Sequence, residues 1–235
     1  MPTSLPPDAP VLVLATPGDT AGVAEEIASV VRVDNPQIEV RLTSVAGLAD
    51  SLPSGREAIV VPLLTWDDPV VLAEIGKTVA ARGEGVVVTE ALGPHPLLAE
   101  ALHIRLAERG LARADRVRLL NVSSPVDAVI LATVGGERAV HAVQATAVLL
   151  ASRLTLPVVA ASLDSEPGVA VAAERLRAAG ADRLAVSPCV IGYEAPRDLV
   201  ERAAASINAG HAEPLGSHSA VAELVARAYG SQLAT

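Results

Sequence analysis

Short apolar runs alternate along the chain with longer, alanine-rich stretches that carry charged residues at helical spacing. Strands are expected in the first half at residues 11–15, 38–43, 58–64 and 85–89, and helices at 19–33 and 69–82, with a further helix starting at His95-Pro96. Strands are expected in the second half at 127–133, 157–162 and 184–190, with a shorter fourth at 213–215, and helices at 137–154, 167–179, 196–209 and 219–229. Strands of about five residues between helices of roughly 10–15 residues are typical of βαβ units. Because the strands are almost continuously apolar, we expect parallel sheets covered on both faces.

The chain also repeats itself about half its length apart. LGPHPLLAEAL at 92–102 returns as LGSHSAVAELV at 215–225, and LATPG at 14–18 returns as LATVG at 131–135. Alanine- and leucine-rich helices resemble one another in any protein, but the shared Gly and His favour an internal duplication. The sequence therefore predicts two tandem α/β domains, 1–124 and 125–235, that meet near NVSSP at 121–125. Each should hold a roughly four-stranded parallel sheet flanked by helices.

Composition narrows the class of protein. Hydrophobic residues make up 51% of the chain, aromatic residues 1%, and Phe is absent, so the core must be built from Val, Leu, Ile and Ala. A net charge of −9 argues against a nucleic-acid partner, which requires clustered Lys and Arg. The single cysteine, Cys189, allows no internal disulfide and fits a reducing compartment. The first residues lack a signal-peptide pattern, and no apolar run reaches the roughly 18–20 residues of a membrane span. We therefore expect a cytoplasmic protein without a membrane partner.

Ligands of parallel α/β sheets bind beyond the carboxyl ends of the strands. That rule selects a small set of positions, namely 16–19, 44, 65–68, 90, 133–138, 162–165 and 191–194.

Several stretches resemble the class II chelatases, the sirohydrochlorin ferrochelatases and cobaltochelatases of the CbiX and SirB type. They are ALGPHPLLAEALHIRLAERG at 91–110, RLRAAGADRLAVSPCVI at 175–191, EPLGSHSAVAELVARAYG at 213–230, and the third strand at 58–64. The likeness covers about residues 9–230. It implies insertion of a divalent metal, Fe or Co, into a tetrapyrrole during sirohaem or cobalamin synthesis. It also implies a metal (Fe, Co or Ni) as substrate or ligand, a tetrapyrrole as the small-molecule partner, and no organic cofactor.

The sequence departs from this family where the family's catalytic histidines stand. The family's first strand ends in a His-Gly-Ser-Arg type sequence, but here Thr16 takes the place of the His and Asp19 lies near that of the Arg. The second His-bearing loop is shortened to TWDDP at 65–69. Imidazole suits the removal of pyrrole protons near neutral pH, whereas threonine does not. Asp67 or Asp68 could act as a weak base or a hard metal ligand. The alternative is therefore a degenerate relative that binds a tetrapyrrole, a metal or a protein partner without turnover. An unrelated doubly wound small-molecule binder is a third interpretation.

Each candidate residue also has a structural interpretation. Thr16 and Asp19 could simply begin a helix, and Asp68 before Pro69 matches helix capping. His95, a weak metal candidate with Asp67, and His218 could each hydrogen-bond locally at a helix start. No two histidines have the i, i+4 spacing of a helical metal site.

The substrate-binding candidates are Trp66, Gly135, Arg138 and Tyr193. Trp66 could line a flat cofactor pocket or seal a domain interface. Gly135 and Arg138 belong to a glycine turn that could approach an anion at a helix start. Cys189, Tyr193 and Glu194 could form a corner of soft ligands, although a lone Cys that ends a buried strand is more often part of the core.

Overall fold

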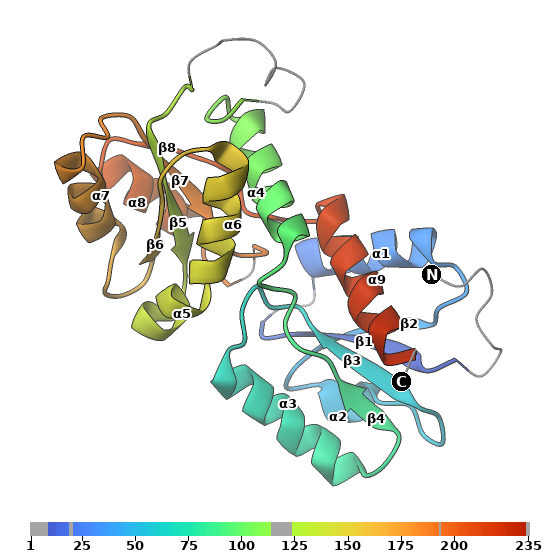
Figure 1. Cartoon of the computed structure of the whole chain (residues 1–235). Helices are drawn as coiled ribbons and strands as arrows, with labels where there is room; N and C mark the ends of the chain where they lie inside the picture. Colours follow the sequence, from blue (N-terminus) through green and yellow to red (C-terminus); the bar gives the residue numbers. More distant parts are fainter. Residues whose placement is uncertain (1–8, 19–20, 114–123, 193, 234–235) are drawn as a thin grey trace. The chain divides into compact units, whose positions relative to one another are not determined.

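The computed structural model describes residues 9–18, 21–113, 124–192 and 194–233 (Figure 1). Contacts within the chain divide it into two compact units. Unit 1 consists of Met1–Leu92 together with Ser217–Thr235, and unit 2 is Gly93–Gly216. Each unit contains one four-stranded parallel sheet, which confirms the predicted α/β architecture.

The sheet of unit 1 has the strand order β2-β1-β3-β4. Its strands are β1 (Val11–Thr16), β2 (Val40–Ser44), β3 (Ala58–Pro62) and β4 (Val86–Val88). Its helices are α1 (Val23–Asp34), α2 (Leu48–Ser51), α3 (Pro69–Arg82) and α9 (Ser219–Leu233). Alternate residues of β1 and β3 pack against α2 and α3, while α1 and α9 pack together and α9 contacts β3. Every residue of β1 and β3 is buried, as expected for strands covered on both faces.

Unit 2 repeats this arrangement with the strand order β6-β5-β7-β8. Its strands are β5 (Ala128–Thr133), β6 (Val158–Ser162), β7 (Leu184–Pro188) and β8 (Gly210–His211). Its helices are α4 (Pro96–Glu108), α5 (Gly136–Ala142), α6 (Gln144–Leu154), α7 (Val169–Ala178) and α8 (Arg197–Ser206). The pair α7 and α8 covers one face of the sheet, and α4 and α6 pack together beside β6 and β7 (Figure 1).

The repeated Leu-Gly-x-His motif marks the places where the chain changes unit. The chain passes from unit 1 to unit 2 between Leu92 and Gly93, in the first copy of the motif, and returns to unit 1 between Gly216 and Ser217, in the second copy. Helix α4 follows the first copy and packs in unit 2, whereas α9 follows the second copy and packs in unit 1. The two halves of the sequence repeat thus exchange their last helices. The predicted domain boundary at 124/125 borders residues 114–123, which lie outside the described residues, and it stays a prediction about the extent of the repeat.

Some predicted elements are wrong in detail. The fourth strand of the second half is Gly210–His211, paired with Ala185 and Val186, and not 213–215. Pro214 has no N–H to donate to a ladder, which explains why the predicted segment is not a strand. The helix predicted at 137–154 is two helices that meet at Val143, whose ψ of 3° departs from helical geometry. The four-residue helix α2 is too short to give a periodic signal and was not predicted.

The helix starts that were predicted from capping residues are more accurate. Helix α3 spans 69–82 as predicted, from the Asp68 cap to Gly83, whose φ of 93° ends it. Helix α1 begins only at Val23, because Gly22 has a φ of 61°.

Within the described ranges, no helix combines the length and apolar character needed to cross a bilayer.

Candidate functional site

Thr16 ends β1 at the position where the resemblance implies a catalytic histidine. Its side chain is fully buried, and its hydroxyl donates to the carbonyl oxygen of Gly18 at 2.8 Å. This bond stabilises the turn that leaves the strand. Asp19, the neighbouring candidate, lies outside the described residues.

The loop after β3 is tied to the loop after β4. The amide of Leu92 donates to the carbonyl of Leu64 at 2.9 Å, and the amide of Ala91 donates to Oδ1 of Asp67 at 3.0 Å. The Asp67 carboxylate therefore holds two loops of unit 1 together. Oδ1 of Asp67 therefore already accepts a hydrogen bond from the protein backbone.

Asp68 caps helix α3. Its Oδ1 accepts from the amides of Val70 at 2.9 Å and Val71 at 3.3 Å, which satisfies two of the unpaired N–H groups at the helix start. Trp66, two residues earlier, is only 8% exposed. An indole with so little free surface offers little to a flat ligand.

The repeated histidines make the same bond in both copies. Nδ1 of His95 accepts from the amide of Leu97 at 3.1 Å, and Nδ1 of His218 accepts from the amide of Ala220 at 3.1 Å. A ring nitrogen that accepts a backbone N–H has no lone pair left for a metal ion. The identical geometry explains why the motif repeats, since each copy starts a helix that follows a change of unit.

The glycine turn after β5 already holds an anion, which is a carboxylate of the protein itself. The amide of Gly135 donates to both Asp164 oxygens, at 3.1 and 3.2 Å, and the amide of Gly136 donates to Oγ of Ser162 at 3.2 Å. Oγ of Ser162 in turn donates to Asp164 at 2.6 Å. Burial tends to raise the pKa of Asp164, but the bonds from Ser162, Gly135 and Ser165 outweigh it and lower that pKa. An external anion would have to displace this carboxylate.

The sequence analysis included Ser162–Ser165 among the candidate positions but did not foresee that this loop closes the glycine turn. The signal is the pair Ser162, at the end of a strand, and Asp164, two residues later, a spacing that favours local hydrogen bonds to backbone amides. Arg138 follows the turn on α5 and is exposed.

The loop after β7 is organised by Glu194. Its carboxylate accepts from the amides of Ile191 at 2.9 Å and Gly192 at 2.7 Å. Cys189 is buried at the end of β7, and its amide donates to the carbonyl of Ala132 at 2.7 Å. Tyr193 lies outside the described residues.

Among the residues that the structure does describe, no group of three or more His, Cys, Asp or Glu is placed to hold a metal ion.

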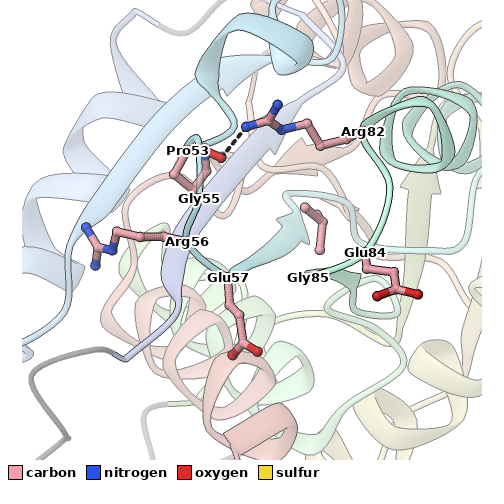
Figure 2. Close-up of a pocket in the computed structure, with 8 residues that line it drawn as sticks. Pro53, Gly55, Arg56, Glu57, Arg82, Glu84 and Gly85 are labelled. Carbon is pink, nitrogen blue, oxygen red and sulfur yellow. Dashed lines mark hydrogen bonds between the residues drawn. The ribbon is translucent and has the colours of Figure 1, made fainter.

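A cavity of about 470 Å³ lies in unit 1 at the amino ends of β3 and β4, the opposite end from the predicted ligand positions (Figure 2). Its lining residues are Pro53, Gly55, Arg56, Glu57, Arg82, Glu84, Gly85 and Val86. Arg82 donates to the carbonyl of Pro53 at 2.6 Å, and Arg56 pairs with Glu39 at 2.5 Å. All four charged lining side chains are exposed, so the cavity is an open polar recess. Ligand sites usually combine an apolar lining with a few converging polar groups, and this recess does not.

No family model matches the sequence, and no curated protein matches it. Solved structures do resemble the chain over most of its length. The sirohydrochlorin chelatase SirB from Bacillus subtilis subspecies spizizenii, solved in complex with cobalt, gives a TM-score of 0.69 at 13% identity and covers 95% of this chain and 94% of its own.

CbiX, described as the terminal enzyme for siroheme biosynthesis in denitrifying bacteria, gives a TM-score of 0.64 at 18% identity, with 94% of this chain and 98% of its own covered. A multi-domain protein of Deinococcus radiodurans, described as similar to chelatases but with two additional domains, gives 0.63 at 18% identity and covers 94% of this chain and 55% of its own. These similarities confirm the predicted resemblance at the level of the fold.

Proposed function

We propose that this chain is a chelatase-fold relative that binds a divalent metal or a tetrapyrrole without catalysing metal insertion. The observation that carries the proposal is the use of Thr16, Asp67 and Asp68 within unit 1. All three stand at the predicted ligand end of the sheet, and all three make hydrogen bonds within unit 1 that stabilise a turn, a pair of loops or a helix end.

Metal insertion demands chemistry that these groups supply poorly. Two pyrrole N–H protons must leave while the metal exchanges its ligands for ring nitrogens, and a base with a pKa near neutrality suits that task. A threonine hydroxyl is no such base. Carboxylates prefer hard ions such as Mg²⁺ and Ca²⁺ over the Fe²⁺ or Co²⁺ of chelatases.

The charge of the ligand-end loops favours a cation over a polycarboxylate macrocycle. The segments 63–68, 89–92, 163–168 and 189–196 contain no Lys or Arg, and they carry the acidic residues Asp67, Asp68, Glu90, Asp164, Glu166 and Glu194, while segment 133–138 adds the opposite charges of Glu137 and Arg138. A free polycarboxylate tetrapyrrole would be repelled by these acidic loops in either unit. We therefore expect its binding to strengthen as salt screens the repulsion, while binding of a metal ion should weaken.

A second candidate function is metal insertion itself, into a sirohydrochlorin-type tetrapyrrole of sirohaem or cobalamin synthesis. The specific observation in its favour is the fold similarity to SirB and CbiX, which extends over 94% or more of each partner. Under this alternative, Asp67 or Asp68 would be the weak base.

One assay separates the two functions. Purified protein is mixed at micromolar concentration with sirohydrochlorin and Co²⁺ or Fe²⁺, and the absorbance change is compared with the spontaneous rate. The proposal predicts a spectral shift on mixing with the metal or the macrocycle, and an unchanged rate of insertion.

The variants Asp67→Asn and Asp68→Asn test whether any acceleration depends on these two carboxylates, and Asp50→Asn on α2 is the matched control. Acceleration that is lost in either of the first two variants, and kept in the control, would establish the second function. Absence of both binding and acceleration would overturn the proposal.

A further inference from the structure

Hydroxyl side chains gather on one face of the sheet in unit 2. Thr133 of β5 is paired with Ser162 of β6, and Leu131 of β5 is paired with Ser187 of β7. Paired residues of parallel strands share a face, and so do residues two apart along a strand. Thr133, Ser162 and Ser187 therefore point to the same side.

This side is the one beneath α4 and α6. The alternate residues of the same strands, such as Ile130, Ala132 and Val186, belong to the apolar core formed with α7 and α8. Thr146 of α6 is also buried, as are Ala147 and Leu150 of the same helix.

Three of these hydroxyls have no hydrogen-bond partner among the described residues, namely Thr133, Thr146 and Ser187. Their side chains are 0%, 1% and 0% exposed. Buried polar groups in folded proteins are nearly always paired, with protein or with internal water, because an unpaired one costs folding free energy. Ser162 differs, since its hydroxyl is bonded to Asp164 and Gly136.

The chemistry of the three groups defines what can satisfy them. Each is neutral and can both donate and accept, so the fitting ligand is small, neutral and able to do both. Thr133 and Ser187 lie diagonally on neighbouring strands, with Cα atoms about 8 Å apart by ordinary sheet spacing, a span that one bridging molecule can close. We infer that unit 2 holds an internal water molecule that bridges Thr133 and Ser187 on the sheet face covered by α4 and α6.

Unit 1 supplies a built-in contrast. Leu14 of β1 is paired with Val61 of β3, so a valine stands on the rung that Ser187 occupies in unit 2. Thr16, the counterpart of Thr133 in the repeat, is hydrogen-bonded to Gly18. The inferred water site therefore belongs to unit 2, and it is independent of the proposed function.

The direct test is a high-resolution crystal structure of the full chain. A density peak within hydrogen-bond distance of both hydroxyls is the expected result. A dry layer, or hydroxyls that instead donate to backbone carbonyls, would overturn the inference.

Stability and hydration measurements on variants give a second test. Ser187→Ala should remove one long-lived water, counted by magnetic relaxation dispersion, and both Ser187→Ala and Thr133→Val should lower the urea midpoint. In unit 1, Val61→Ala should also lower the midpoint but leave the water count unchanged, because apolar cavities stay dry. If Thr133→Val and Ser187→Ala both raise the midpoint and the water count stays constant, the hydroxyls are unhydrated and the inference is wrong.

Discussion

Units 1 and 2 share a scaffold and differ in the polar groups at its ligand end. Their sheets have the same strand order, and in both the first strand ends in a buried threonine. Unit 1 stabilises its loops with Asp67 and caps a helix with Asp68, whereas unit 2 closes a glycine turn with Asp164. Apolar side chains thus maintain the same register in both units. The polar residues at the ligand end instead make different hydrogen bonds in the two units.

The two units also depend on each other through the chain. Each sheet is covered by a helix from the other half of the repeat, so the sequence halves and the compact units do not coincide. The comparison therefore predicts which changes should damage one unit and which should damage both alike.

Removal of α9 should have the largest effect, and it should be confined to unit 1. A chain that ends at Gly216 loses the buried side chains Ala220, Val221, Ala222, Leu224, Val225 and Tyr229. Their burial contributes on the order of 10 kcal/mol, which is comparable to the whole stability of a domain. Trp66, the single tryptophan, reports on unit 1, so its fluorescence should show no cooperative urea transition, while far-UV circular dichroism retains the transition of unit 2.

A chain that ends at Leu233 is the matched control and should keep both transitions. A cooperative Trp66 transition in the shorter chain would show that unit 1 is stable without α9.

Asp164→Asn should produce the next largest effect, and in unit 2 alone. The substitution weakens the bonds from Ser162, Ser165 and Gly135, at a cost of about 2 kcal/mol after allowance for solvent screening. Because the folded-state pKa of Asp164 is lowered, its contribution is complete above the ordinary carboxyl pKa of about 4 and is lost as pH falls through the folded value. The difference between wild type and variant in urea unfolding should therefore shrink in acid. Asp182→Asn, at an exposed turn of the same unit, serves as the control, and a difference that grows in acid would contradict the assignment.

Substitution of the two histidine caps should affect both units equally. His95→Ala and His218→Ala each remove an acceptor from a helix start, and each should cost about 1 kcal/mol. Asn at either position can accept the same backbone N–H, so His95→Asn and His218→Asn should recover most of that loss. Chemical unfolding of the four variants checks this, and Asn variants as unstable as the Ala variants would refute the capping role.

Thr16→Val should have the smallest effect. It removes the hydroxyl's bond to Gly18, which contributes roughly 0.5–1 kcal/mol. Thr133→Val in unit 2 provides the paired measurement. The rate of cobalt insertion into sirohydrochlorin is also measured with the wild-type protein and with the Thr16→Val variant. If the two rates differ, Thr16 has a chemical role that its hydrogen bond does not reveal.

The sequence was sufficient to predict the elements whose signals are local. Helix α3 has the predicted bounds because the Asp68-Pro69 start and the Gly83 end act within one turn of the helix. The continuously apolar strands β1 and β5 indicated parallel sheets. The packing of α4 in unit 2 and of α9 in unit 1 could not be predicted. The sequence pattern of an amphipathic helix indicates that one face covers a sheet, but it does not indicate which sheet. The two-residue strand β8 is too short for any periodic pattern.

At the candidate site, the sequence offers candidate positions but does not show the groups to which their side chains are hydrogen-bonded. Asp68 was correctly weighed as a cap, because its contacts lie two and three residues away. The bond from Ala91 to Asp67 and that from Gly135 to Asp164 join segments more than 20 residues apart, and only the folded sheet brings them together.

The most direct test of the account is a single-turnover experiment, with the protein in about tenfold excess over sirohydrochlorin, so that product release cannot hide the chemical step. Cobalt is added, and the rate constant of the absorbance change is compared with that of the same mixture without protein. The account predicts equal rate constants, and a spectral shift when the protein is mixed with the metal alone or with the macrocycle alone. A faster reaction with protein, lost on Asp67→Asn substitution, would contradict it.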